Sequence, residues 1–336
     1  MNRNIIMKKV SRSVLRKDWL RLNENNSHVS PFQQWALHDI IARHYLFFFL
    51  AQREWPCYFA FYKGKEMIMI APLCKRYTMR GISYYSFGAT PTIAFQDFIY
   101  GDDLTEDDMK ECLELLYRKC KKLSFYNLPA ESLLLKVLKK DKEPQKQNIN
   151  FTIPLNVSYE NYYNALDKHV RQNVRTAYNR MKTDEKTWQV ELIEGKDVGK
   201  ELLKEMMDVY VERRKARYRG TSRLHEWYLR HEHFNTIALS KLDIARYIVL
   251  TIDGKVAAFL AGYVDEKNSS LLIPRLAISG DYNRYSPGVV LINESMKLLE
   301  NNMKIEYLDL SKGNDKYKET MGGVFITPTT SYKRVA

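Results

Sequence analysis

Hydrophobic positions form two similar patterns that predict β-hairpins. Tyr58–Leu73 (YFAFYKGKEMIMIAPL) and Tyr247–Gly262 (YIVLTIDGKVAAFLAG) each hold two runs of β-forming residues on either side of a short turn. Each turn contains a glycine, Gly64 or Gly254, which adopts positive φ at no steric cost. The pattern therefore predicts one hairpin in each half of the chain.

The same order of elements follows both hairpins. In the first half, a helix predicted over 106–122 leads into a strand over 123–129. In the second half, a helix predicted over 289–302 leads into a strand over 305–311. Repetition at this scale indicates a repeated structural unit. We therefore expect an α+β fold with two tandem domains, each built on a mixed sheet in the order hairpin, strand, helix, strand.

Helical periodicity marks the start of the second half. Apolar residues three or four apart predict a helix over 159–182 and another over 198–214. The apolar face of the first comprises Tyr163, Leu166, Val170, Val174, Ala177 and Met181. The polar segment 139–150 is expected to be a linker, and 151–155 a strand.

Length and charge narrow the class of protein. A chain of 336 residues suits two domains of ordinary size. Its longest apolar candidate, Tyr45–Ala51, is far shorter than the roughly 20 residues that span a bilayer. Residues 1–21 are rich in lysine and arginine and lack the apolar stretch of a secretory signal, so they are expected to form a basic N-terminal tail. The net charge of +13 is spread, which suits an anionic small molecule or surface polymer as well as RNA.

Cysteine and histidine spacing offers no metal site. No CxxC pair occurs, so we expect reduced core thiols in a cytoplasmic protein, at Cys57, Cys74, Cys112 and Cys120. His231 and His233 would diverge by about 200° on a helix, so we expect no metal ion there.

One strand carries a signal of acyl-transfer chemistry. Segment 271–279 (LLIPRLAIS) is interrupted by Pro274, and a proline within a strand requires an edge, a bulge or a splay. A splayed strand presents backbone N–H groups that can polarise a thioester carbonyl. We therefore expect this strand to bind an acyl donor through Leu276, Ala277 and Ile278.

The loop 280–288 (GDYNRYSPG) opens directly into the helix that follows. Ser286 is expected to cap that helix and Pro287 to occupy its first position. A helix N-terminus binds phosphate through its free N–H groups, and Gly288 leaves room for a phosphate to approach. The residues expected to bind the donor here are Arg284, Tyr285, Ser286, Gly288 and Val289. The alternative is a well-capped helix that binds nothing.

The matching loop of the first half differs. Segment 86–96 has no basic residue and leads to Asp102 and Asp103, whose charges repel a phosphate. We therefore do not expect it to bind one.

Three residues within or shortly after the last predicted strand are candidates for catalysis. Tyr317 falls in a short predicted helix, where a phenol with a pKa of about 10 can protonate a leaving thiolate. Lys318 could stabilise developing negative charge, and a purely structural tyrosine is the alternative. Asp309 is favoured to order the turn at Gly313, and its alternative role is general base.

Two basic clusters complete the candidates. Arg171 and Arg175, four residues apart, could clamp a carboxylate or phosphate of the acceptor. The second cluster, 213–219, is expected to be largely a solvated surface.

Taken together, these residues resemble the CelD/BcsL-like GNAT acetyltransferases over nearly the whole chain. The more specific motifs are Tyr285-Ser286-Pro287-Gly288 and Asp309-(x3)-Gly313-(x3)-Tyr317-Lys318. Weaker ones are Ser30-Pro31-Phe32-Gln33-Gln34-Trp35, Ala71-Pro72-Leu73, Arg171-(x3)-Arg175-(x4)-Arg180 and Asp253-Gly254-Lys255. The proline in the phosphate loop departs from the usual glycine-rich GNAT pattern.

The resemblance implies a degenerate GNAT-like domain over 22–147 and an acyltransferase domain over 148–336. It implies acetyl-CoA or another acyl-CoA as co-substrate, and an amine or hydroxyl acceptor such as a sugar precursor or surface glycan. The wider relatives include Fem-type transferases, which use aminoacyl-tRNA, so tRNA is an alternative donor. A non-catalytic binding module of a polysaccharide synthesis complex is the alternative outside enzymes.

Overall fold

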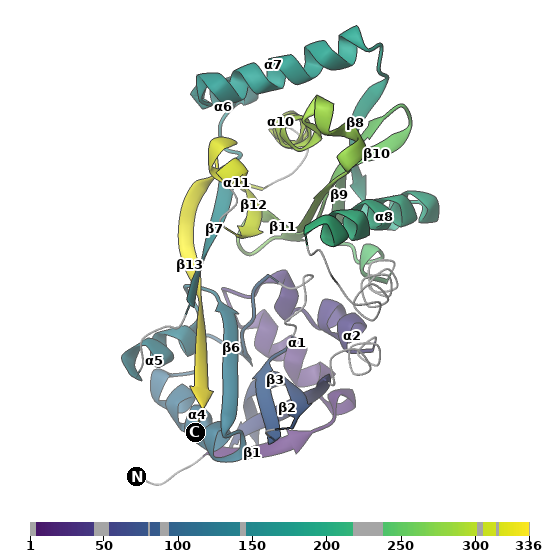
Figure 1. Ribbon diagram of the computed structural model, residues 1–336. Coiled ribbons are helices and arrows are strands. Elements are labelled where there is room, and N and C mark those ends of the chain that lie inside the picture. The colour runs from purple at the N-terminus through teal and green to yellow at the C-terminus, as the bar shows by residue number, and fades with distance from the viewer. Residues whose placement is uncertain are drawn as a thin grey trace. The chain divides into compact units, whose positions relative to one another are not determined.

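The computed structural model divides the chain into two compact units (Figure 1). Unit 1 comprises Met1–Ile149 and Thr327–Ala336, and unit 2 comprises Asn150–Ile326. The residues that the structure describes are 5–43, 54–79, 81–87, 94–141, 146–217, 238–300, 305–313 and 316–335.

The unit 1 sheet follows the order β1-β2-β3-β4-β6 and is completed by the end of β13. Strands β4 and β6 are parallel, whereas the other neighbours are antiparallel. A short strand, β5 (Ile99–Tyr100), pairs with β3. The strand bounds are β1 Ile5–Val10, β2 Glu54–Lys63, β3 Glu66–Thr78, β4 Gly81–Ser86, β6 Lys122–Leu128 and β13 Val324–Val335.

Helices pack on this sheet, and the first begins within the expected basic tail. The helices are α1 Arg16–Glu24, α2 Trp35–Arg43, α4 Glu106–Lys119 and α5 Leu133–Asp141. Trp19 of α1 is fully buried, and its indole donates to the carbonyl of Gln33 at 2.7 Å. Residues 5–21 therefore lie within the fold as β1 and most of α1, because their apolar positions outweigh their charge.

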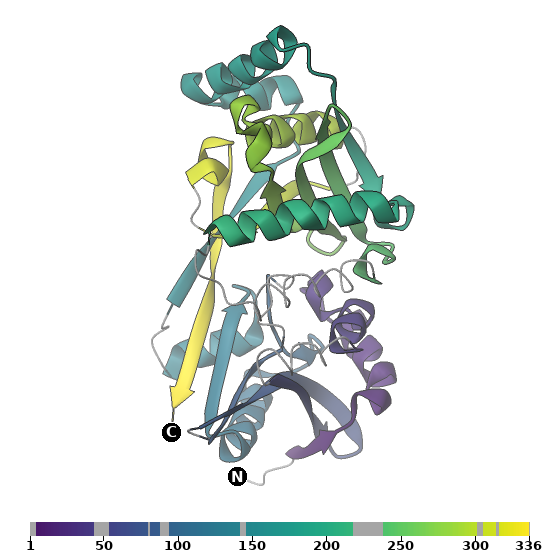
Figure 2. The same ribbon diagram turned by 45° about the vertical axis from the view of Figure 1, so that its right-hand side comes forward.

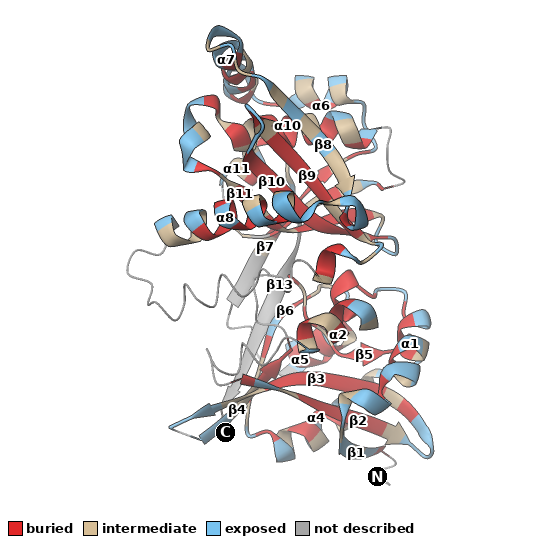
Figure 3. Cartoon of the chain, turned by 90° about the vertical axis from the view of Figure 1, so that its right-hand side faces the viewer, coloured by how far each residue is buried: buried red, intermediate tan, exposed pale blue. Residues whose placement is uncertain are grey.

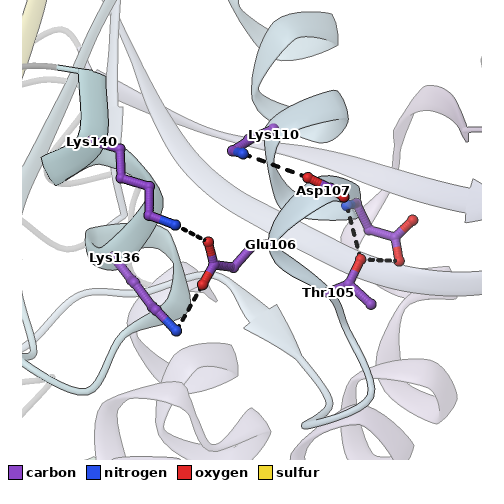
Figure 4. A network of polar contacts seen from close by, with 7 residues as sticks. Thr105, Glu106, Asp107, Lys110, Lys136 and Lys140 are labelled. Carbon is purple, nitrogen blue, oxygen red and sulfur yellow. Dashed lines mark hydrogen bonds and ion pairs between the residues drawn. The ribbon is translucent and has the colours of Figure 1, made fainter. Parts of the chain in front are cut away.

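The N-terminus of α4 is occupied by the helix's own side chains (Figure 4). The Thr105 hydroxyl accepts from the N–H of Asp108 at 3.1 Å. Glu106 pairs with Lys136 and Lys140 of α5, and these hydrogen bonds lower the pKa of Glu106 to about 2. Acidic groups in a first helical turn compensate the positive end of the helix dipole.

The unit 2 sheet follows the order β7-β12-β11-β10-β9-β8. Strands β11 and β12 are parallel, and the other neighbours with a defined register are antiparallel. The strand bounds are β7 Lys146–Pro154, β8 Trp188–Glu194, β9 Ala245–Ile252, β10 Lys255–Asp265, β11 Ser270–Ile278 and β12 Tyr307–Lys312.

Helices cover both faces of this sheet (Figures 1 and 2). Helices α7 and α10 contact each other on one face, whereas α8 packs against β10 and β11 on the other. The core of unit 2 lies between the α10 face and the strands, where Leu250, Leu260 and Leu291 are fully buried (Figure 3). The helix bounds are α6 Tyr159–Ala165, α7 Lys168–Thr183, α8 Lys200–Arg217, α10 Pro287–Glu300 and α11 Lys316–Thr320.

Each unit's sheet takes one strand from outside the local run of the chain. After α5, the chain enters β7, which pairs with β12 in unit 2. After α11, the chain enters β13, whose residues Thr330–Val335 pair with β6 in unit 1. The strand that follows the corresponding helix in each repeat is therefore exchanged.

Most predicted elements agree with the structure in order and in type, with two exceptions. Both hairpins form, and the second turns through Asp253 and Gly254, which both have positive φ. The prediction of one helix over 159–182 is wrong, because the extended backbone of Leu166 and Asp167 separates α6 from α7. Residues 146–150 of the expected linker belong to β7. The segment Tyr45–Ala51 lies outside the described residues.

Two further observations concern the described part of the chain. It contains no helix that is both long and apolar enough to cross a membrane. All four cysteines are free and buried, and burial raises the pKa of the Cys120 thiol to about 12.

Candidate active site

The site begins where two parallel strands of unit 2 separate. Strands β11 and β12 pair through only three residues, and the last pair joins Leu272 to Asp309. From Ile273 onward, β11 pairs with β10 alone. The splay predicted at Pro274 is therefore present, and it opens immediately before the proline.

A bulge in β11 accompanies the splay, because Ile273 and Pro274 of β11 lie opposite the single residue Gly262 of β10. The register of β10 against β11 shifts between Ala261 and Tyr263. A Cβ atom on the intervening Gly262 would lie 2.4 Å from the carbonyl oxygen of Leu272. Only glycine permits this close backbone approach, so Gly262 fixes the local shape of the strands around the splay.

The loop after β11 forms a 3₁₀ turn, η4 (Gly280–Tyr285), and then enters α10 at Pro287. Ser286 directly precedes the helix, and its carbonyl accepts from the N–H of Val289 at 3.0 Å. Its φ of 47° is left-handed, in contrast to the extended backbone of an ordinary N-cap. The first turn of α10 contains no acidic residue, so its N-terminus keeps its positive potential.

Arg284 and Tyr285 are held away from the helix start by α7. The Arg284 guanidinium pairs with Asp184 at 2.7 Å, and the Tyr285 hydroxyl donates to the same carboxylate at 2.9 Å. These hydrogen bonds lower the pKa of Asp184 below its usual value. The contacts fasten the loop to the end of α7.

A pocket of about 210 Å³ lies at the splay and at the start of α10. Its walls come from β11, the α10 N-terminus, α11 and α8. The residues that line it are Arg213, Leu276, Ile278, Asn283, Ser286, Pro287, Gly288, Val289, Tyr317 and Met321. The pocket thus brings together Tyr317 and five of the eight residues expected to bind the donor. Ala277 is fully buried beside it in β11, and Arg284 and Tyr285 are in the adjoining loop.

Tyr317 and Lys318 have different environments although they are neighbours. Tyr317 is half-buried on the pocket wall. Lys318 is buried, and its ammonium donates to the carbonyls of Leu310 at 2.8 Å and Ser311 at 3.0 Å. Lys318 does not line the pocket, and its contacts hold the end of β12 against α11.

Asp309 contacts the backbone at the end of β12. Its carboxylate accepts from the N–H of Ser311 at 2.6 Å, and Ser311 has a positive φ of 59°. Burial raises the pKa of Asp309 to about 7, although the Ser311 hydrogen bond and the Lys318 charge act in the opposite direction. A carboxyl group with this pKa can exchange a proton near neutral pH.

Two polar residues of β7 that the sequence analysis missed lie near Asp309. Thr152 is opposite Asp309 in the antiparallel pair, so their side chains share one face of the sheet. Asn150 follows the same face two residues away. Within the described residues, the Thr152 hydroxyl and the Asn150 carbonyl oxygen are buried without hydrogen-bond partners. Such groups can receive polar atoms of a bound molecule.

The remaining candidates lie apart from the pocket or outside the described residues. Arg171 is half-buried and Arg175 exposed on α7, and neither lines the pocket. Arg213, from the cluster expected to be a solvated surface, does line it. His231 and His233 lie outside the described residues, and among those described no group of three His, Cys, Asp or Glu side chains could hold a metal ion.

The arrangement agrees with comparisons to known proteins. Residues 168–319 match the model of the GNAT acetyltransferase domain. No curated protein matches the sequence. The matched residues lie within unit 2 and include the splay and every described residue that lines the pocket except Met321, and similarity to a GNAT acetyltransferase domain indicates transferase activity.

Solved structures extend the likeness to both units. FemX has a TM-score of 0.60 at 11% identity, covering 98% of this chain and 97% of that chain. A tandem GNAT protein from the clavulanic acid biosynthesis pathway has a TM-score of 0.53 at 10% identity, covering 98% of each chain. The L-PGS of Bacillus licheniformis has a TM-score of 0.52 at 13% identity, covering 80% of this chain and 81% of that chain. The tandem GNAT-like fold predicted from the internal repeat is thus confirmed.

Proposed function

We propose that unit 2 transfers an acyl group, with acetyl as the first choice, from an acyl-CoA to an amine or hydroxyl acceptor. The observation that carries the proposal is the pocket that joins the splay of β11, the N-terminus of α10 and Tyr317. A sugar precursor or a surface polysaccharide component is the acceptor class that we propose, in a protein of the cytoplasm.

The described residues fit an acyl-CoA in chemical kind. Leu276 and Ile278 give the pocket apolar walls on β11, and the unpaired edge of that strand offers backbone groups to an amide-containing arm. The start of α10 offers N–H groups and positive potential to a pyrophosphate. Gly288 carries no side chain that would obstruct this approach.

Acyl transfer then needs proton movements that two residues can supply. The acceptor nitrogen or oxygen bonds to the thioester carbonyl carbon and loses a proton, for which the Asp309 carboxylate is our candidate base. The C–S bond breaks as the tetrahedral intermediate collapses, and the thiolate takes a proton from the Tyr317 hydroxyl. Free N–H groups of the splayed strand stabilise the oxyanion. In this proposal Lys318 positions β12, and Arg171 and Arg175 remain candidates for contact with the acceptor.

Ligand binding tests this proposal. A ligand present at 100 times its Kd raises stability by about 2.7 kcal/mol, so CoA and acetyl-CoA should each raise the melting temperature of the full chain. Calorimetry should give a stoichiometry of one per chain. Stabilisation by an aminoacyl-tRNA and not by CoA would favour the Fem-type donor. An absence of any response to both would favour a non-catalytic binding module.

A further inference from the structure

Arg213 contributes the one charged side chain among the described residues that line the pocket. The rest of that lining is apolar or neutral. One guanidinium nitrogen of Arg213, Nη1, is buried and has no hydrogen-bond partner in the described part of the chain. A buried donor without a partner is costly, and native structures usually pair such groups with protein, water or ligand.

The course of α8 indicates which part of the pocket Arg213 occupies. The carboxylate of Glu205 in α8 accepts from the N–H of Val256 in β10 at 2.9 Å. The carbonyl of the next residue of β10, Ala257, accepts from the N–H of Ser279, the residue directly after β11. Farther along the helix, Met207 and Tyr210 contact Arg275 in the middle of β11. The helix therefore runs antiparallel to β11.

Arg213 follows Tyr210 by about one helical turn, toward the point at which β11 and β12 separate. Helix α8 covers the sheet face opposite α10. The N-terminus of α10 and Arg213 thus approach the pocket from opposite faces of the sheet. If a phosphate binds at the start of α10, Arg213 remains available to contact a different group of the bound molecules.

We propose that Arg213 recognises an anionic group, either a carboxylate or a phosphate, at the end of the pocket where the acyl group is transferred. Two sources share this chemistry: a distal carboxylate on the acyl group, or an anionic group on the acceptor. A guanidinium pairs with either through two parallel hydrogen bonds. The inference rests on the proposed function and adds a specificity-determining residue to it.

Binding of matched neutral and anionic probes tests the proposal. For the acyl source, acetyl-CoA is compared with succinyl-CoA by calorimetry on the full chain. For the acceptor source, glucosamine is compared with glucosamine 6-phosphate in the presence of saturating CoA. We expect the anionic member of one pair to bind about tenfold more tightly, since a charge-assisted hydrogen bond is worth at least that factor.

Variants assign the preference to Arg213. Arg213→Met keeps the length of the stem and should abolish the preference, and Arg213→Lys should keep part of it. Lys204→Met, which removes an exposed charge from the same helix, should leave it intact. The melting temperature of each variant without ligand, compared with that of the native chain, shows whether the variant is folded.

Four results overturn the inference. The first is that the preference for the anionic probe persists in Arg213→Met. The second is that the native chain prefers neither anionic probe although it binds CoA. Should CoA itself not bind to the native chain, the proposed function fails and this inference fails with it. Should Arg213→Met not fold, Arg213→Lys decides, because unchanged discrimination by a single ammonium would contradict fork-like recognition.

Discussion

The two units repeat one strand order, but the helices α4 and α10 begin in opposite ways. In unit 1, α4 starts with three consecutive acidic residues, and Thr105 caps it with its side chain. In unit 2, α10 starts with Pro287 and Gly288 and has no acid in its first turn. The first arrangement neutralises the helix N-terminus from within, and the second leaves it available to an external anion.

The residues after the next strand differ as well. The fifth residue after β6 is Leu133, and the fifth after β12 is Tyr317. Along the strands themselves, Leu123 and Phe125 belong to the core of unit 1 as Leu308 and Leu310 do to that of unit 2, and the residue between each pair is Ser124 in unit 1 and Asp309 in unit 2. The two units therefore share a fold although they differ at the few positions on which the expected chemistry depends.

Removing the Tyr317 hydroxyl should produce the largest fall in turnover, because the side chain then has no proton to donate, like Leu133 at the compared position of unit 1. A general acid typically contributes about 10²–10⁴-fold, so turnover of Tyr317→Phe should fall at least tenfold. Steady-state kinetics measures this, with CoA affinity as the control. Undiminished turnover would make Tyr317 structural, and lost affinity alongside lost turnover would indicate a packing defect.

A larger side chain at position 288, at the start of α10, should have the second largest effect, a loss of CoA affinity. A valine at 288 places its Cβ about 3.4 Å from Ile278 and extends branches into the pocket. Overpacking of this kind costs roughly 1–3 kcal/mol, so Gly288→Val should weaken CoA binding by about 10- to 100-fold. Gly199→Val, at an exposed glycine before α8, is the matched control for the β-branched change. Equal affinity of the two variants would remove the contrast between α10 and α4.

Asp309 offers a pH-dependent test. As a base with a pKa of about 7, it is roughly one-tenth ionised at pH 6 and nine-tenths at pH 8. Turnover should therefore rise about ninefold between these values, and Asp309→Asn should have a low rate that varies less with pH. A flat wild-type profile would exclude Asp309 as the base.

The same group predicts a direction for stability. Burial raises the pKa of Asp309 from 3.8 to about 7, so the folded chain holds its proton more tightly than the unfolded chain. That contribution is fully present below about pH 4 and is lost as the pH rises to 7. Denaturation of the wild type and Asp309→Asn at pH 5 and 8 should show the wild type losing relative stability at the higher pH. The opposite trend would contradict the environment described for this carboxyl.

Arg284 should matter least. It is 62% exposed and already pairs with Asp184, and exposed pairs are worth about 0–1 kcal/mol. Arg284→Ala should therefore change CoA affinity by less than about fivefold. A larger loss, measured by titration calorimetry, would mean that the guanidinium leaves Asp184 to bind the phosphates.

The sequence predicted those features that depend on neighbouring residues. Gly64 and Gly254 mark their turns, Pro274 marks the splay, and Pro287 marks the start of α10, because each acts on the backbone locally. The break at Asp167 was hidden by an apolar face that continues through Leu166. The helical spacing of apolar residues alone therefore does not distinguish one long helix from two helices with a break between them.

Features that depend on distant contacts were missed. Arg213 belongs to a run of charges that is typical of a solvated surface, and only the packing of α8 on β11 brings it to the pocket. Thr152 and Asn150 became relevant through the pairing of β7 with β12. No local pattern indicates that β13 pairs with a strand some 200 residues earlier.

That last pairing has a consequence for biosynthesis. Strand β6 pairs with residues 330–335 of β13, which are synthesised about 200 residues after β6. Until then, β6 keeps an unpaired edge, and such edges invite association with other chains. The amino-terminal unit therefore cannot complete its sheet in the usual vectorial order, because its last strand is synthesised only after all of unit 2.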